Sequence, residues 1–235
     1  MREMDKFQCK VLSVVMAILL LGAMFLVGRE AAAYVAGISV TRGEMCVVLD
    51  AGHGGDDPGK IGVNDAKEKD VNLAIALLVK EYLEAADVKV VLTREGDGGL
   101  YDAGADNKKV QDMKRRVDIF ESAGAALAVS IHQNSYPEEY VHGAQVFYYT
   151  GSVEGQKLAE SIQSCLITLV DPENTRQVKA NDSYYLLKKT GIPIVIAECG
   201  FLSNEEEAEK LCDREYQKKI AWAVHLGILQ YINSK

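Results

Sequence analysis

The sequence has 235 residues, of which 48% are apolar and 26% are charged, a balance typical of a globular protein with a hydrophobic core. Its formal net charge of −8 argues against nucleic acid as a partner, because neutralising phosphate groups requires a basic surface. The length is sufficient for a targeting segment followed by one domain of ordinary size.

Residues 1–33 have the pattern of a targeting segment. A mildly basic start precedes an uncharged, largely apolar run at residues 11–28, and three alanines follow at residues 31–33. This run is long enough to be either a cleaved signal peptide or a retained membrane anchor, with a buried core helix as a third alternative. Either of the first two would place the rest of the chain outside the cytoplasmic membrane.

The next elements are expected in chain order, as short β-rich runs that alternate with longer helical runs. The expected order is a strand at 46–49, a helix at 68–86, a strand at 88–93, a helix at 107–122, a strand at 126–132, an edge-type strand at 145–149, a helix at 154–169, a short strand at 184–187, a buried strand at 193–197 and a helix at 215–232. Residues 96–106 are expected to form the one long loop.

This alternation of strands and helices predicts a single α/β domain at residues 44–235. Its sheet should be mainly parallel, with helices covering both faces. The five cysteines show no spacing that indicates disulfides, so we expect free thiols.

Polar residues follow several of the predicted strands at the points where those strands end. His53 follows the first strand, His132 ends the third, and Glu198 ends the strand at 193–197. Glu68 opens the first helix of the domain, on the same side of the sheet. Since ligands of open parallel sheets bind at the carboxyl ends of the strands, these four side chains are expected to converge.

Two neutral imidazoles and one carboxylate, with a fourth position left for water, are a common catalytic zinc set. A second carboxylate nearby can take the proton from that water. Each residue also has a purely structural interpretation: His53 could cap the backbone of its glycine-rich turn, Glu68 could stabilise a helix dipole, and His132 could be a core residue. The structural interpretation is weakest for Glu198, because a carboxylate at the end of an apolar strand is costly unless it is paired or metal-bound.

Five motifs carry a resemblance to a known family: DAGHGG at 50–55, EKDVNL at 68–73, LTR at 92–94, SIHQN at 130–134 and ECGFLSN at 198–204. Together they resemble the zinc N-acetylmuramoyl-L-alanine amidases of the amidase-3 family over residues 47–232. The resemblance implies that His53, Glu68 and His132 bind Zn²⁺ and that Glu198 is the catalytic carboxylate. Ala51 stands where the family usually has proline, and Gln133 where a small residue is common.

Within this family the sequence is most similar to the germination-specific amidases of spore-forming bacteria. That similarity implies a peptidoglycan substrate in the spore cortex or cell wall, cleaved between N-acetylmuramic acid and L-alanine. It leaves open whether an accessory protein is needed, and whether residues 1–33 hold the enzyme on the membrane.

Two other functions remain as alternatives. Cys199 and His132 could form the nucleophile and base of a thiol hydrolase. The chain could also be a non-catalytic peptidoglycan-binding or regulatory protein with an amidase fold. Arg94 and Arg116 are expected either to bind a substrate carboxylate or to form surface ion pairs. We expect no role in the site for the two remaining histidines, His142 and His225.

Overall fold

The computed structural model describes residues 45–235, together with Met16, Leu20 and Gly22. The rest of the predicted targeting segment lies outside the described residues. None of the helices in the described part of the chain is both long enough and apolar enough to cross a membrane. The chain divides into two units, Met1–Arg42 and Gly43–Lys235, and every helix and strand named below belongs to the second.

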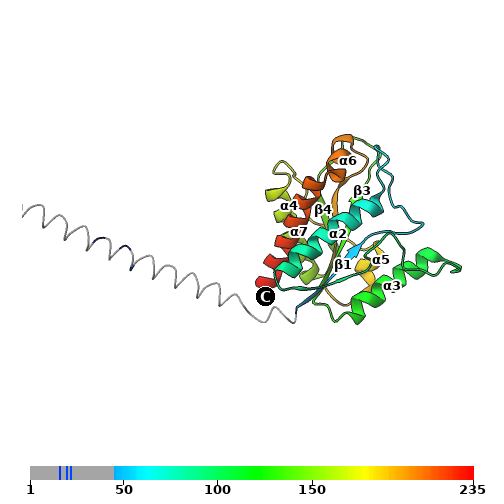
Figure 1. The fold of residues 1–235 in the computed structure, drawn as a ribbon, viewed down its shortest axis with the longest axis horizontal. Helices are drawn as coiled ribbons and strands as arrows, with labels where there is room; N and C mark the ends of the chain where they lie inside the picture. Colours follow the sequence, from blue (N-terminus) through cyan, green and yellow to red (C-terminus); the bar gives the residue numbers. More distant parts are fainter. Residues whose placement is uncertain (1–15, 17–19, 21, 23–44) are drawn as a thin grey trace, which may run out of the picture. The chain divides into compact units, whose positions relative to one another are not determined.

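Six strands form one sheet in the order β2-β1-β3-β6-β4-β5 (Figure 1). In chain order the strands are β1 (Cys46–Ala51), β2 (Lys89–Leu92), β3 (Leu127–Asn134), β4 (Gln145–Tyr149), β5 (Lys179–Asn181) and β6 (Ile194–Phe201). All neighbouring pairs are parallel except β4 and β6, which are antiparallel. The predicted α/β fold with a mainly parallel sheet is therefore confirmed.

Helices cover both faces of this sheet, and in Figure 1 α2, α4 and α7 lie together on one side while α3 and α5 lie on the other. The helices are α2 (Glu68–Ala85), α3 (Lys108–Ser122), α4 (Val153–Leu169), α5 (Tyr185–Lys189), α6 (Glu205–Cys212) and α7 (Arg214–Asn233).

The residues of a strand alternate between the two layers, because successive side chains point to opposite faces of a sheet. Val47 and Leu49 of β1 pack in the core formed with α2, α4 and α7, whereas Val48 packs in the core formed with α3 and α5. Every residue of β1 and β6 is buried, as expected for central parallel strands covered on both sides.

Helices α3, α4, α6 and α7 begin where a side chain accepts a hydrogen bond from a free amide of the first turn. Asn107, Ser152, Asn204 and Asp213 each accept one from the residue three positions later. Helix α2 has no side-chain cap, but its apolar face is buried against the sheet.

Several details of the predicted secondary structure are wrong. Residues 185–187 begin helix α5, with Tyr184 just before it, rather than forming a strand. The Asn181 side chain accepts hydrogen bonds from the backbone of Ser183 and Tyr184 and turns the chain there. Strand β5 precedes that turn and forms the edge of the sheet, so β4 is an interior strand. Helix α6 was not predicted. The expected long loop at 96–106 is also not the one long loop, because residues 52–67 form another between β1 and α2.

Candidate active site

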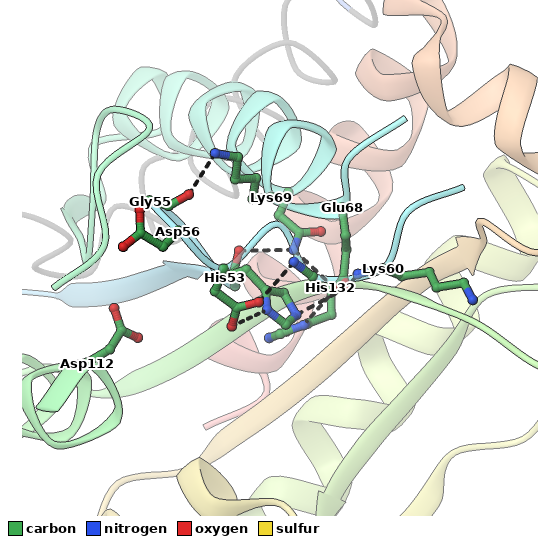
Figure 2. Close-up of polar contacts among 12 residues, drawn as sticks. His53, Gly55, Asp56, Lys60, Glu68, Lys69, Asp112 and His132 are labelled. Carbon is green, nitrogen blue, oxygen red and sulfur yellow. Dashed lines mark hydrogen bonds and ion pairs between the residues drawn. The ribbon is translucent and has the colours of Figure 1, made fainter. Parts of the chain in front are cut away.

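The ends of β1 and β3 and the start of α2 bring three of the predicted residues together (Figure 2). Glu68 Oε2 lies 3.1 Å from His53 Nε2, and Glu68 Oε1 lies 2.9 Å from His132 Nδ1. The three residues can each offer one ligand atom, all within 4.8 Å of one another. Their arrangement is suitable for holding one metal ion.

Glu68 is held in place by groups from three different segments. The backbone amides of Lys60 and Gln133 donate hydrogen bonds to its carboxylate, at 2.8 and 3.1 Å, and the Asn72 side chain donates another at 3.3 Å. Burial alone would raise the pKa of Glu68, but its contacts with His132 and His53 lower it well below its usual range. Glu68 is therefore a fixed, ionised carboxylate between two imidazoles.

His53 occupies a left-handed backbone conformation, with φ of 64°, immediately after β1. Its Nδ1 lies 3.0 Å from Asp57 Oδ2, which leaves Nε2 directed at Glu68. Burial lowers the pKa of His53, but the hydrogen bonds and charges of Glu68 and Asp57 raise it to about 9. Asp57 thus orients the ring, as carboxylates often do for metal-binding histidines. Sequence reasoning missed Asp57, although it lies four residues after His53 in the same loop.

Two glycines allow the candidate ligand side chains to approach the backbone. A Cβ on Gly52 would lie 2.2 Å from His132 Cε1, and a Cβ on Gly59 would lie 2.5 Å from Glu68 Oε2. Gly59 also has φ of +67°, a backbone conformation that residues other than glycine rarely adopt. Larger residues at these two positions would displace the ligand side chains.

Two buried arginines hold the backbone that carries His53. Arg94 Nε donates to the carbonyl of Ala51 at 2.9 Å, and its Nη2 donates to that of Gly52 at 3.2 Å. Arg116 donates to the carbonyls of Ala51 and His53, at 2.9 and 2.7 Å. Their exposed fractions are only 6% and 1%. Surface ion pairing, one of the two roles expected for these arginines, is therefore wrong, and the other, binding of a substrate carboxylate, stays a prediction.

The charge of Arg116 is balanced inside the protein. Asp112 accepts a hydrogen bond from its Nε at 2.6 Å, and the buried Asp50 accepts one from its Nη1. Thr93 and Ser130 donate further hydrogen bonds to Asp50. Because each buried charge has a partner, this network can fix the end of β1 without leaving a charge unpaired.

Glu198 lies on β6 directly beside His132 on β3, with which it is in register. Its exposed fraction is 6%, and within the described residues its Oε2 has no hydrogen-bond partner. Burial raises the pKa of Glu198 to about 7, with Glu68 adding to the rise and His132 opposing it. Glu198 Oε1 lies 3.4 Å from the hydroxyl of Tyr184, a residue that sequence reasoning placed in a strand.

These groups face a cleft of about 410 Å³. His53, His132 and Glu198 line it, as do Tyr101, Lys109 and Tyr184. The structure therefore brings all four predicted residues together and opens three of them to a cavity that can admit a substrate.

Cys199 lies on the other face of the sheet. It packs in the core formed with α2, α4 and α7, its exposed fraction is 1%, and its thiol contacts the carbonyl of Ala197 at 3.5 Å. Burial also raises the pKa of this thiol. A buried thiol that faces away from His132 cannot serve as a nucleophile in this cleft, so the thiol-hydrolase alternative is wrong.

The remaining cysteines and histidines lie where the sequence predicts. The described cysteines, Cys46, Cys165, Cys199 and Cys212, are all free. His142 is exposed in a loop, and His225 is buried beside Trp222 on α7. Neither of these histidines is among the residues that line the cleft.

Comparison with known proteins gives the family. Residues 47–230 match the sequence profile of the amidase-3 family, described as N-acetylmuramoyl-L-alanine amidase. The chain belongs to this family of amidases. A germination-specific N-acetylmuramoyl-L-alanine amidase of Bacillus subtilis (strain 168) is 38% identical over 192 residues, which cover 80% of each chain.

Solved structures of other amidases have the same fold. The CwlD amidase of Clostridioides difficile, determined in complex with the GerS lipoprotein, is 42% identical with a TM-score of 0.80, covering 82% of this chain and 100% of that one. An N-acetylmuramoyl-L-alanine amidase of Clostridium difficile 630 is 30% identical with a TM-score of 0.72, covering 81% and 98%. The predicted family is therefore confirmed, and the chain is a peptidoglycan amidase.

Proposed function

We propose that this peptidoglycan amidase depends on zinc, with His53, Glu68 and His132 as the metal ligands and Glu198 as the catalytic acid and base. The observation that carries the proposal is the cluster of three candidate ligand atoms within 4.8 Å, beside a buried carboxylate with one oxygen that has no hydrogen-bond partner among the described residues. Two imidazoles and one carboxylate are a donor set that zinc commonly uses in hydrolases.

The residues around this cluster fit a metal ion. Asp57 holds Nδ1 of His53, so that Nε2 is available as a ligand, and the amides around Glu68 fix its carboxylate. When bound, zinc supplies a Lewis acid that polarises the amide carbonyl and makes water at the site more acidic. The protein supplies the orientation of the ligands and a base for the proton.

Glu198 takes part in both halves of the reaction. It accepts a proton from the attacking water as the water oxygen bonds to the lactyl carbonyl carbon of the muramic acid. It then returns that proton to the nitrogen of L-alanine as the carbon–nitrogen bond breaks. The products are a lactyl carboxylate and a peptide with a free amine. A pKa of about 7 is suited to a group that must both accept and donate a proton near neutral pH.

Removal of the metal is expected to abolish activity. The purified enzyme would be treated with a chelator, assayed on purified peptidoglycan, and assayed again after zinc is added back, with the products identified by mass. We expect release of stem peptides to stop in the chelated enzyme, because no metal is left to activate water. Release should return when zinc is added back. A thiol alkylator should have little effect, since Cys199 is buried. Full activity in the chelated enzyme would exclude this proposal.

We further propose that the substrate is peptidoglycan of the spore cortex, which the similarity to the Bacillus germination-specific amidase supports. Such a substrate lies outside the cytoplasm, so residues 1–33 would direct export, as a cleaved signal or as an anchor. A fusion of residues 1–40 to a reporter that is active only outside the cytoplasm should be active. An inactive reporter that is retained in the cytoplasm would contradict export.

An accessory protein is also part of this proposal. The CwlD amidase, to which this chain is similar, was determined in complex with a lipoprotein. This likeness supports a lipoprotein partner for the present chain. If the full chain is purified from the envelope of the cells that produce it naturally, a lipoprotein should be purified with it.

A further inference from the structure

The two oxygens of the Glu198 carboxylate have different surroundings. Oε1 lies 3.4 Å from the Tyr184 hydroxyl, whereas Oε2 has no partner among the described residues. Glu198 is almost fully buried, so protein contacts rather than bulk water decide how its carboxylate is oriented. The asymmetry means that Oε1 is tethered, whereas Oε2, itself buried in the protein, keeps its capacity to accept a hydrogen bond or a proton.

Tyr184 is held in place by contacts that do not involve Glu198. Its backbone amide donates to the Asn181 side chain at 2.9 Å, and its ring packs edge-on against Phe147 of β4, with a centroid distance of 5.6 Å. Tyr184 is also the residue before α5, and Leu186 and Leu187 of that helix are buried in the core. The hydroxyl therefore approaches Glu198 from a rigid support.

Tyr184 is a hydrogen-bond donor over the whole range in which an amidase works. Burial, followed by the negative charges of Glu198 and Glu68, raises its pKa to about 12. The phenol consequently keeps its proton and donates it in a hydrogen bond to the carboxylate. A neutral donor of this kind favours the ionised form of Glu198, which is the form that can accept a proton from water.

We propose that Tyr184 is a positioning residue for Glu198, whose hydroxyl holds Oε1 so that Oε2 is the oxygen that takes and returns the proton. This inference rests on the proposed role of Glu198 as acid and base. Without the hydroxyl, the carboxylate would lose its one described side-chain tether and spend less time in the reactive orientation. The loss should therefore appear in the chemical step rather than in binding of the substrate or the metal.

The test is the variant Tyr184→Phe, which removes only the hydroxyl and keeps the ring against Phe147. We expect kcat to fall about 10- to 100-fold, the factor that corresponds to a hydrogen bond to a charged group. KM, zinc content and melting temperature should remain close to those of the parent. The control is Tyr149→Phe, which removes the hydroxyl of an exposed tyrosine on β4 that does not line the cleft, and it should change kcat by less than about twofold.

A double-mutant cycle shows whether Tyr184 acts through Glu198. If it does, adding Tyr184→Phe to Glu198→Gln should cause almost no further loss, because the group being positioned is already inactive. Parental kcat in Tyr184→Phe, or equal losses in the presence and absence of Glu198, would overturn the inference. An inactive or zinc-independent parent would instead count against the proposed function, so the two failures can be told apart.

Discussion

Replacing His53 or His132 with alanine is expected to abolish both zinc retention and amidase activity. Each substitution removes one of the three ligand atoms that lie within 4.8 Å of one another. The two that remain would bind zinc far more weakly, since catalytic zinc sites commonly use three protein ligands. Metal content and turnover should be measured on the same purified preparation of each variant.

A matched control is available for these variants. His142→Ala makes the same chemical change at an exposed histidine that does not line the cleft, so zinc content and activity should remain at the parental level. Stoichiometric zinc and full activity in His53→Ala or His132→Ala would show that the replaced residue is not a ligand. Loss of zinc in the His142→Ala control would point instead to a general effect on folding.

The positions of the candidate ligands could be predicted because they depend on topology. Alternating strands and helices predict a parallel sheet, and the carboxyl ends of its strands lie along one edge. His53 follows β1, His132 and Glu198 lie in the carboxyl-terminal halves of β3 and β6, and Glu68 begins the helix that follows β1. Because the carboxyl ends of parallel strands lie at the same edge of a sheet, these distant segments could be placed together from the sequence alone.

The surroundings of the ligands could not be predicted, because they depend on side-chain burial and loop geometry. The sequence around Arg94 and Arg116 does not indicate that their side chains point inward to backbone carbonyls rather than to solvent. The aromatic run at 184–187 has the composition of a strand, and only the hydrogen bonds of Asn181 make it a helix start. As a consequence, the link between Tyr184 and Glu198 could not be seen in the sequence.

Alternation along β6 explains why the thiol-hydrolase alternative is wrong. Glu198 and Cys199 are adjacent in a strand, so their side chains must point to opposite faces of the sheet. Since His132 is paired with Glu198 across the sheet, Cys199 had to lie away from that histidine. The structure shows this arrangement, with the thiol in the core and the carboxylate at the cleft.

Glu198→Gln is expected to lower turnover by about 10²- to 10⁴-fold, the usual contribution of general acid–base catalysis. Glutamine keeps the size and polarity of the side chain but cannot accept the proton of the attacking water. Folding and zinc content should be unchanged, because the candidate ligand atoms belong to His53, Glu68 and His132. Zinc content, melting temperature and turnover should all be measured on one preparation.

Glu207 provides the control that separates a catalytic carboxylate from a structural one. It is also buried, but its two oxygens accept hydrogen bonds from the amides of Gly143 and Phe201, at 3.0 and 2.8 Å. Glu207→Gln should therefore reduce the free energy of unfolding, by about 1–3 kcal/mol, while the folded fraction stays active. Glu198 has an oxygen without such a partner in the described part of the chain, so its amide variant should show the opposite result, with stability kept and catalysis lost. A folded, zinc-loaded Glu198→Gln enzyme that turned over at the parental rate would remove Glu198 from the mechanism.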